Sequence, residues 1–144
     1  MAVFFCITMG AEVGNASGIS WVSFDNGVAM GEKQKKKVFV TFMANWCGYC
    51  KKMDREAFSN TEVINYINAN FVPIKVDTDK EKALGMKYGV QGLPTHMFLS
   101  ETGESLGTLP GYIETDKFLV VLKYIATDSY KTMKLQDFMA SQKK

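Results

Sequence analysis

The sequence predicts an α/β protein: a central mixed β-sheet flanked by helices, followed by an extra C-terminal helix. Three observations favour this class. Apolar, β-prone runs alternate along the chain with segments of helical periodicity. The last two runs are separated only by a short turn, which requires antiparallel pairing, whereas strands separated by helices pair in parallel. The length of 144 residues is that of a single domain.

The expected strands share apolar, β-prone sequence and lie at 19–24, 38–43, 71–76, 95–99 and 105–110. The second is a continuous run of the kind that a buried central strand shows. Pro73 cannot donate a hydrogen bond, so it indicates that the first half of the third strand lies at a sheet edge or end. Gly103 supplies the positive φ needed in the turn 101–104 before the last strand.

The expected helices lie at 25–37, 47–58, 61–68, 79–87 and 114–126. Asp25 and Asn60 are the expected N-caps of the first and third helices, and Gly89 is the expected C-cap of the fourth. Gly27 and Gly31 weaken the prediction of the first helix, because glycine is a poor helix former.

Two further segments have an expected place beside these elements. The lysine run formed by Lys33 and residues 35–37 is interpreted as a solvated helix end, where cations suit the helix dipole. Residues 127–144 form the C-terminal extension. They are expected to be amphipathic, with one face that packs on the domain or, less favoured, binds a partner. That face consists of Tyr130, Met133, Phe138 and Met139.

Composition excludes several classes of protein. With 47% hydrophobic and 22% charged residues, the chain is globular and not disordered. A net charge of +2, from 17 basic and 15 acidic residues, is too small for a dedicated nucleic-acid binder. No apolar run approaches the roughly 20 residues that a membrane span needs. The three cysteines are an odd number, so they cannot all pair within one chain.

The N-terminus indicates export. Residues 2–10 are nearly all apolar and match the core of a secretory signal peptide. Gly14 and Ala16 suit a cleavage site that leaves Ser17 as the first mature residue. Residues 1–16 are therefore expected to be a leader containing Cys6, and residues 17–126 the domain. The expected location is periplasmic or otherwise exported. The lack of a basic residue before the apolar run leaves a cytoplasmic location as the alternative.

The chemistry is expected at Cys47 and Cys50, which follow a buried strand and open a helix. The first turn of a helix has free N–H groups and a positive dipole end, and both stabilise a thiolate at Cys47. Cys47 is then the attacking sulfur and Cys50 the resolving one, in two exchange steps through a mixed disulfide. A zinc site, a purely structural disulfide and two inert thiols are less favoured. A zinc site needs four ligands, more than Cys47, Cys50 and the single histidine supply. A disulfide that closes a four-residue loop adds little stability, so a purely structural role is weak. Two inert thiols would not explain why the pair stands at the start of a helix.

Residues 44–51 (ANWCGYCK) and 92–95 (GLPT) resemble the thioredoxin superfamily, and the resemblance extends over 19–126. It implies that Pro94 is cis and lies against the cysteine pair, and that the backbone beside Leu93 pairs with an extended substrate segment. The substrate-binding residues expected from it are Trp46, Gly48, Tyr49, Leu93 and Pro94. It implies no metal, and no cofactor beyond the redox-active disulfide Cys47–Cys50.

Residues 51–63 resemble more specifically the thioredoxin-like C-terminal domain of DsbD-type proteins and small exported thioredoxin-like proteins. Such domains and thioredoxin place a buried Asp six residues before the first cysteine, and this chain has Thr41 there. Asp54, one turn after Cys50, matches a carboxylate of DsbD-type domains and is the expected proton acceptor. Pairing with an adjacent basic residue on the helix surface is an equal alternative. Lys75 matches a lysine that pairs with the missing Asp, so its role is open.

The dipeptide Gly48-Tyr49 resembles that of DsbC-type isomerases, although this chain lacks their dimerisation domain. His96, the single histidine, is expected to be a hydrogen-bonded structural residue of a core strand.

The predicted function is that of a thiol–disulfide oxidoreductase that reduces protein disulfides. We expect a monomer that is re-reduced by an upstream thiol donor of DsbD or thioredoxin type. A disulfide isomerase or oxidase is the first alternative, and a non-catalytic partner-binding module is the second.

Overall fold

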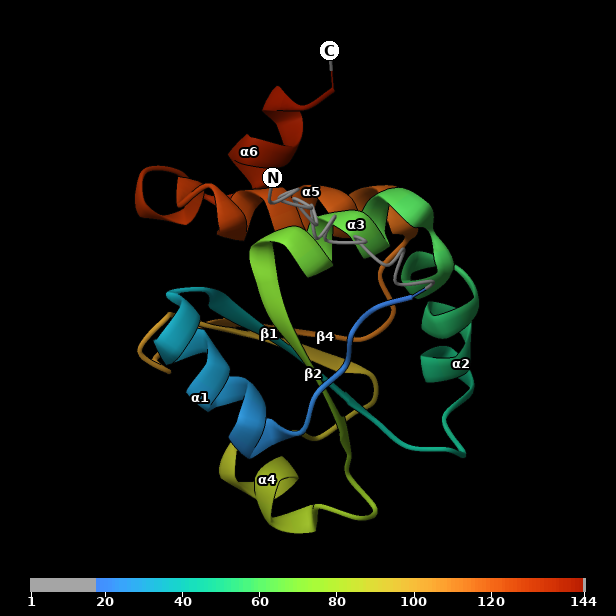
Figure 1. Ribbon diagram of the computed structural model, residues 1–144. Helices are drawn as coiled ribbons and strands as arrows, with labels where there is room; N and C mark the ends of the chain where they lie inside the picture. The colour runs from blue at the N-terminus through green and yellow to red at the C-terminus, as the bar shows by residue number, and fades with distance from the viewer. Residues whose placement is uncertain (1–17, 144) are drawn as a thin grey trace, which may run out of the picture.

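The computed structural model describes residues 18–143 (Figure 1). The strands are β1 (Lys37–Met43), β2 (Phe71–Asp77), β3 (Thr95–Leu99) and β4 (Ser105–Pro110). The α-helices are α1 (Phe24–Gln34), α2 (Gly48–Arg55), α3 (Thr61–Asn70), α4 (Lys82–Lys87), α5 (Thr115–Ala126) and α6 (Leu135–Ser141). Two short 3₁₀ helices are η1 (Ala57–Ser59) and η2 (Ser129–Lys131).

The sheet has the strand order β2-β1-β3-β4. β1 pairs with β2 in parallel and with β3 antiparallel, and β3 pairs antiparallel with β4. The predicted mixed sheet flanked by helices is therefore confirmed. Pro73 lies in the edge strand β2, as its missing N–H predicts.

Helices cover both faces of the sheet, and each face has its own core (Figure 1). Side chains of β1 alternate between them: Phe39 packs with α2, α3 and α5, whereas Val40 packs on the side of α1 and α4. Both side chains are fully buried. This two-sided burial explains the continuous apolar run of β1, because a central strand meets helices on both faces.

The prediction of a strand at 19–24 is wrong. Only Val22 forms a bridge, to Ile74, and the chain enters α1 at Phe24 with Ser23, not Asp25, at the N-cap. The alternation has another cause. Trp21 packs against one core, and Val22 and Phe24 pack against the other, because the segment passes the edge of the sheet.

The two glycines of α1 are explained by close packing. A Cβ at Gly27 would overlap the side chain of Ile74, and a Cβ at Gly31 would lie 2.7 Å from Cγ2 of Val38. The helix therefore approaches the sheet more closely than a larger residue would allow. α1 ends at Gln34, and Lys35 is its C-cap with a φ of 53°.

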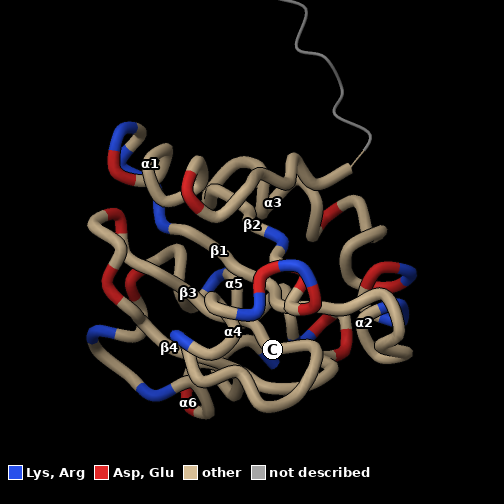
Figure 2. Tube along the Cα trace, turned by 90° about the horizontal axis from the view of Figure 1, so that it is seen from below, with Lys and Arg blue, Asp and Glu red and all other residues tan. Residues whose placement is uncertain are grey.

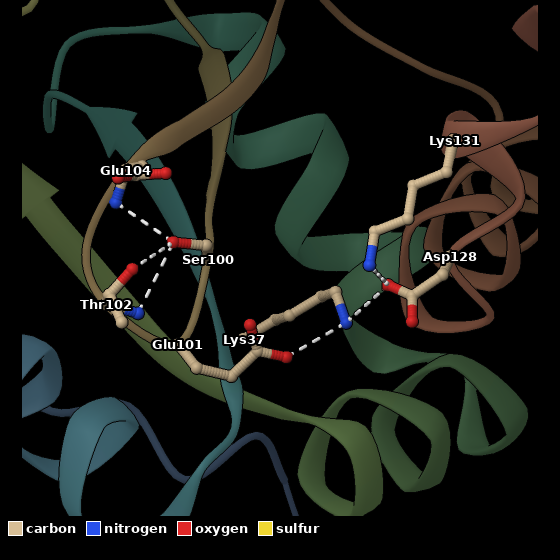
Figure 3. A network of polar contacts seen from close by, with 7 residues as sticks. All are labelled: Lys37, Ser100, Glu101, Thr102, Glu104, Asp128 and Lys131. Carbon is tan, nitrogen blue, oxygen red and sulfur yellow. Dashed lines mark hydrogen bonds and ion pairs between the residues drawn. The ribbon is translucent and has the colours of Figure 1, made fainter.

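The interpretation of the lysine run is wrong for Lys37. This residue opens β1, and its side chain is only 9% exposed. Its Nζ lies 3.0 Å from Oε1 of Glu101 and 2.9 Å from Oδ1 of Asp128 (Figure 3). Lys131 adds a 3.7 Å contact to the same Asp128 oxygen. The ammonium therefore joins the start of the central strand, the β3–β4 turn and the C-terminal extension.

Several boundaries differ from the expected ones. The helix expected at 47–58 ends at Arg55 and is followed by η1, while Asn60 caps α3 as predicted by accepting a 3.1 Å hydrogen bond from the N–H of Val63. The helix expected at 79–87 begins only at Lys82, because the preceding residues form a turn. Gly103 has the expected positive φ, 87°. The C-cap of α4 is Tyr88 and not Gly89, which follows it with a φ of 65°.

The C-terminal extension is not one amphipathic segment with a single face. It consists of η2 and α6, and α6 packs on α5 and stands at the top of the molecule in Figure 1. Phe138 is buried with its ring 5.4 Å from that of Tyr124, whereas Met133 is 41% exposed. The break arises where the Met133 carbonyl accepts a 2.7 Å hydrogen bond from the Tyr124 hydroxyl.

The expected leader, residues 1–16, with Cys6 and the cleavage site before Ser17, lies outside the described residues. Within 18–143, no helix has the length and apolar character needed to cross a membrane.

Candidate active site

The two cysteines of the motif form a disulfide at the start of α2, with their Cα atoms 5.3 Å apart. β1 ends shortly before this point, and Cys47 is the N-cap of α2. The N–H of Cys50 donates to Sγ of Cys47 over 3.1 Å. Both residues are nearly buried, Cys47 at 5% and Cys50 at 3%, so exposure does not separate their roles. Their positions in the helix do separate these roles, because only the sulfur of Cys47 accepts a free N–H of the first helical turn.

An apolar groove of about 390 Å³ lies on one side of the disulfide. Its walls include Trp46, Met86, Val90 and Leu93. Trp46 is 71% exposed, and its Nε1 donates to Oδ2 of Asp79 over 3.0 Å, which fixes the indole ring at the edge of the groove. The structure therefore brings the predicted residues Trp46 and Leu93 together. The Leu93–Pro94 peptide bond is cis.

A narrow crevice without volume for a water molecule lies behind the disulfide. Cys50, Pro94, Thr41, Asp54 and Lys75 are among its lining residues. Nζ of Lys75 is 3.1 Å from Oδ1 of Asp54, so Asp54 pairs across the crevice and not with a neighbour on its own helix. The two predicted catalytic residues Cys50 and Asp54 therefore face one enclosed space.

Lys75 is also held from a second side. Its Nζ lies 4.9 Å from the centre of the Trp21 ring, at a distance typical of a cation–π contact. The resemblance left Lys75 without the carboxylate that it normally meets. In this chain the carboxylate comes from α2, as Asp54, and not from β1, where Thr41 stands.

Thr41 contacts His96 across the β1–β3 pair, with Oγ1 3.2 Å from Nδ1. Burial lowers the pKa of His96 to about 4, and the backbone of Gly111 opposes this shift. Nε2 of His96 is buried and has no hydrogen-bond partner within 18–143. The expected hydrogen-bonded structural histidine is thus found, but only one of its two ring nitrogens is paired.

A second hollow, open and about 370 Å³ in volume, lies on the other side of the motif. It is lined by Gly48, Tyr49, Lys52 and Arg55, and Tyr49 is 63% exposed. The hydroxyl of Tyr112 donates to Glu56 at its margin, and this bond raises the pKa of Tyr112 to about 12.

Every predicted site residue therefore lies in the disulfide or in one of the three depressions around it. Sequence reasoning missed Asp79, Met86, Lys52 and Tyr112. Met86 is exposed and belongs to no motif. Asp79 contacts Trp46, and Lys52 contacts Tyr112, and each contact joins segments that lie far apart in the chain. Within the described part of the chain, no group of three or more His, Cys, Asp or Glu side chains could hold a metal ion.

Comparisons with known proteins agree with this geometry. Residues 24–126 match the family model of the thioredoxin-like domain. Protein disulfide isomerase-like 5-3 of Oryza sativa is 43% identical over 60 residues, which are 42% of this chain and 14% of that protein. The chain thus aligns with only about a seventh of the curated relative.

Two solved structures have the same fold. A thioredoxin from Thermus thermophilus superposes with a TM-score of 0.69 at 27% identity, covering 75% of this chain and 87% of that one. The C-terminal domain of DsbD from Neisseria meningitidis gives a TM-score of 0.58 at 25% identity, covering 69% and 90%.

The match and the Cys47–Cys50 disulfide support the predicted chemical class, thiol–disulfide oxidoreductase. Because the match spans residues 24–126, well over half of the sequence, the chain belongs to the thioredoxin-like domain family.

Proposed function

We propose that this chain reduces disulfide bonds in protein substrates by thiol–disulfide exchange. The observation that carries the proposal is the Cys47–Cys50 disulfide at the N-terminus of α2, placed between the Trp46–Leu93 groove and the crevice behind Cys50. The groove offers an apolar surface for a substrate segment, and the crevice offers a carboxylate near the second sulfur. No cofactor is required beyond the cysteine pair itself.

In the first step, the Cys47 thiolate attacks one sulfur of the substrate disulfide. A Cys47–substrate disulfide forms, the substrate S–S bond breaks, and the second substrate sulfur leaves as a thiolate that takes a proton from solvent. The free N–H groups and dipole at the start of α2 stabilise the attacking thiolate. The Sγ of Cys47 already accepts the N–H of Cys50 at 3.1 Å.

In the second step, Cys50 loses its proton and attacks Sγ of Cys47. The intramolecular disulfide forms, the mixed disulfide breaks, and the remaining substrate sulfur is released as a thiolate. Overall, two electrons pass to the substrate; its first thiolate takes a proton from solvent, and its second takes one that replaces the proton given up by Cys50. We assign Asp54 as the acceptor of the Cys50 proton, with Lys75 holding the carboxylate at 3.1 Å. Thr41 cannot serve, because a hydroxyl is not a base near neutral pH.

Reduction of insulin with dithiothreitol as donor tests the activity. We expect the wild-type chain to accelerate the precipitation of the reduced insulin chains and Cys47→Ser to give only the rate of dithiothreitol alone. Equal rates for the two proteins would contradict the enzymatic proposal and favour a partner-binding module instead.

The direction of electron flow needs a separate measurement. The likeness to the DsbD domain supports a reductant, whereas the rice relative named as an isomerase-like protein supports the isomerase alternative. A redox titration against glutathione distinguishes them. We expect a potential near that of thioredoxin, about −270 mV, and a value of about −180 mV or above would favour the isomerase or oxidase.

We also propose that the protein acts as an exported monomer that an upstream thiol protein of DsbD or thioredoxin type re-reduces. The apolar run at 2–10, followed by Gly14 and Ala16, supports export. N-terminal sequencing of the protein recovered outside the cytoplasm should give Ser17 as its first residue. Recovery of the uncleaved chain from the cytoplasm would contradict export.

A further inference from the structure

We propose that the protein prefers substrate segments with an acidic side chain beside the reacting cysteine, bound by Lys52 and Arg55 on the α2 side of Cys47. This inference rests on the proposed function and specifies its substrate class. It assigns a role to the hollow lined by Gly48, Tyr49, Lys52 and Arg55, which the exchange chemistry itself does not use.

The hollow has the position and size of a binding subsite. Its volume is about 370 Å³, and two of its lining residues, Gly48 and Tyr49, stand between the active cysteines. A substrate sulfur that reaches Cys47 therefore brings its neighbouring side chains to the edge of this hollow. Tyr49, 63% exposed, gives the hollow an aromatic surface that a substrate backbone or stem can cover.

The basic groups of the hollow are available to a partner. The ion pairs formed within 18–143 include neither Lys52 nor Arg55. Figure 2 shows acidic and basic residues close together along α2. Of the acidic residues there, Asp54 pairs with Lys75, and Glu56 accepts the hydroxyl of Tyr112 but keeps its charge. Lys52 and Arg55 together outnumber this one carboxylate, so the charge left without an ion pair is net positive.

Lys52 is held at the hollow by an aromatic contact. Its Nζ lies 4.4 Å from the centre of the Tyr112 ring, and that ring is 6.3 Å from the ring of Tyr49. Because Tyr112 is itself fixed by Glu56, the ammonium is positioned before a substrate arrives, which reduces the entropy lost on binding. Glu114, the other carboxylate near Tyr112, pairs with Lys117 at 3.6 Å.

The opposite side of Cys47 has different chemistry. The groove there is mainly apolar, and the group that contacts Trp46 is a carboxylate, Asp79. Lys82 lines the same groove, so the charges of Lys82 and Asp79 oppose each other there, whereas Lys52 and Arg55 both attract an acidic substrate side chain. The two sides together favour a substrate segment with acidic and apolar residues on opposite flanks of its cysteine.

The test uses peptides closed by one intrachain disulfide, in which the residues flanking both cysteines are Glu, Gln or Lys. Identical flanks ensure that attack on either sulfur meets the same side chain. The ratio of kcat/KM for the Glu peptide to that for the Lys peptide is the readout, because any change in the reactivity of Cys47 cancels in it. For the wild type at low salt we expect a ratio of about ten, falling as salt screens the charges.

The charge-reversed double variant, Lys52→Glu with Arg55→Glu, should invert the preference so that the Lys peptide reacts faster. The matched control is Lys33→Glu in α1, on the other side of the sheet from α2, which should keep the wild-type ratio (Figure 1). Equal rates for the Glu and Lys peptides in the wild type, or an unchanged ratio in the double variant, would overturn the inference while leaving the proposed function intact. If the wild type reduces no peptide at all, the proposed function fails with it.

Discussion

Two lysine–carboxylate clusters lie at opposite ends of the same pair of strands, and their surroundings differ. Lys37, at the start of β1, has a side chain only 9% exposed and meets two carboxylates, Glu101 and Asp128. Lys75, near the C-terminal end of β2 and in the crevice that Cys50 lines, is 29% exposed and meets one carboxylate, Asp54. We call these the Lys37 cluster and the Lys75 cluster.

The same pairing of a lysine with carboxylates is expected to serve two purposes, stability in one cluster and catalysis in the other. The Lys37 cluster joins a strand, a turn and the C-terminal extension and has no reactive group beside it (Figure 3). The Lys75 cluster faces the crevice that Cys50 lines. The first is thus expected to affect stability alone and the second the rate of exchange. Next to the Lys75 cluster lies an uncharged pair, Thr41 with His96, which gives a third environment for comparison.

The largest expected effect is the pH dependence of stability that His96 causes. Its pKa is about 4 in the folded protein and near 6.5 in the unfolded chain. Below pH 6.5 the unfolded chain binds a proton that the folded protein does not, so stability is complete above pH 6.5 and falls as the pH drops toward 4. The full loss is about 3 kcal/mol in the free energy of unfolding.

Urea unfolding of the oxidised protein between pH 7 and 5 measures about 2 kcal/mol of this loss before most carboxylates titrate. His96→Phe should give a nearly flat profile over the same range. A wild-type profile as flat as that of the variant would show that His96 is not buried in its neutral form.

The next effect sharpens the role of the Lys75 cluster. Asp54→Asn keeps the shape of the side chain but removes the base, so resolution by Cys50 should slow about 100-fold, the lower range for general base catalysis. Attack by Cys47 and the free energy of unfolding should change little. Stopped-flow measurement of mixed-disulfide formation and decay separates the two steps. The control is Glu62→Gln, which also replaces a carboxylate by an amide, at an exposed position of α3. Equal slowing of attack and resolution in Asp54→Asn would reject the assignment.

A smaller effect is expected at the Lys37 cluster. Lys37→Met keeps the apolar stem and removes the ammonium, leaving two carboxylates that are 41% and 47% exposed and can be hydrated. The free energy of unfolding should fall by about 1 kcal/mol, with the rate of insulin reduction unchanged. A change in that rate without a change in stability would break the distinction between the clusters.

The smallest effect is expected from Asp128→Asn. Asp128 has φ of 59°, and Asn tolerates this left-handed conformation as well as Asp does, so the change removes charge without backbone strain. Because Lys37 keeps Glu101, the loss should be below about 1 kcal/mol. A loss larger than that of Lys37→Met, measured by urea unfolding, would show that Asp128 stabilises the extension through other contacts.

Sequence patterns predicted the features that depend on local order. The central strand, the cysteine pair at a helix start and the cap at Asn60 all follow from neighbouring residues, and the structure has them. The Lys37 cluster could not be predicted, because Lys37 meets Glu101 from 64 residues away. A lysine at the end of a charged run gives no sign of such burial.

The same limit applies near the active site. The sequence singles out Asp54 and Lys75 separately, but it does not predict that they pair. They are 21 residues apart, and their contact depends on how α2 crosses the sheet. Gly27 was identified as an obstacle to a helix, whereas its role is to let α1 approach Ile74. The alternation of apolar and polar residues at 19–24 predicts a strand. A segment that passes the edge of a sheet, with side chains in the cores on both faces, shows the same alternation as a strand.

The central claim is that Cys47 attacks and Cys50 resolves, and trapping the mixed disulfide tests it most directly. Reduced Cys50→Ser, incubated with insulin and quenched with acid, should accumulate a disulfide between Cys47 and an insulin chain, as mass spectrometry of the tryptic peptides would show. Reduced Cys47→Ser should accumulate none. Trapping by Cys47→Ser at a comparable level, or by neither variant, would contradict the assignment.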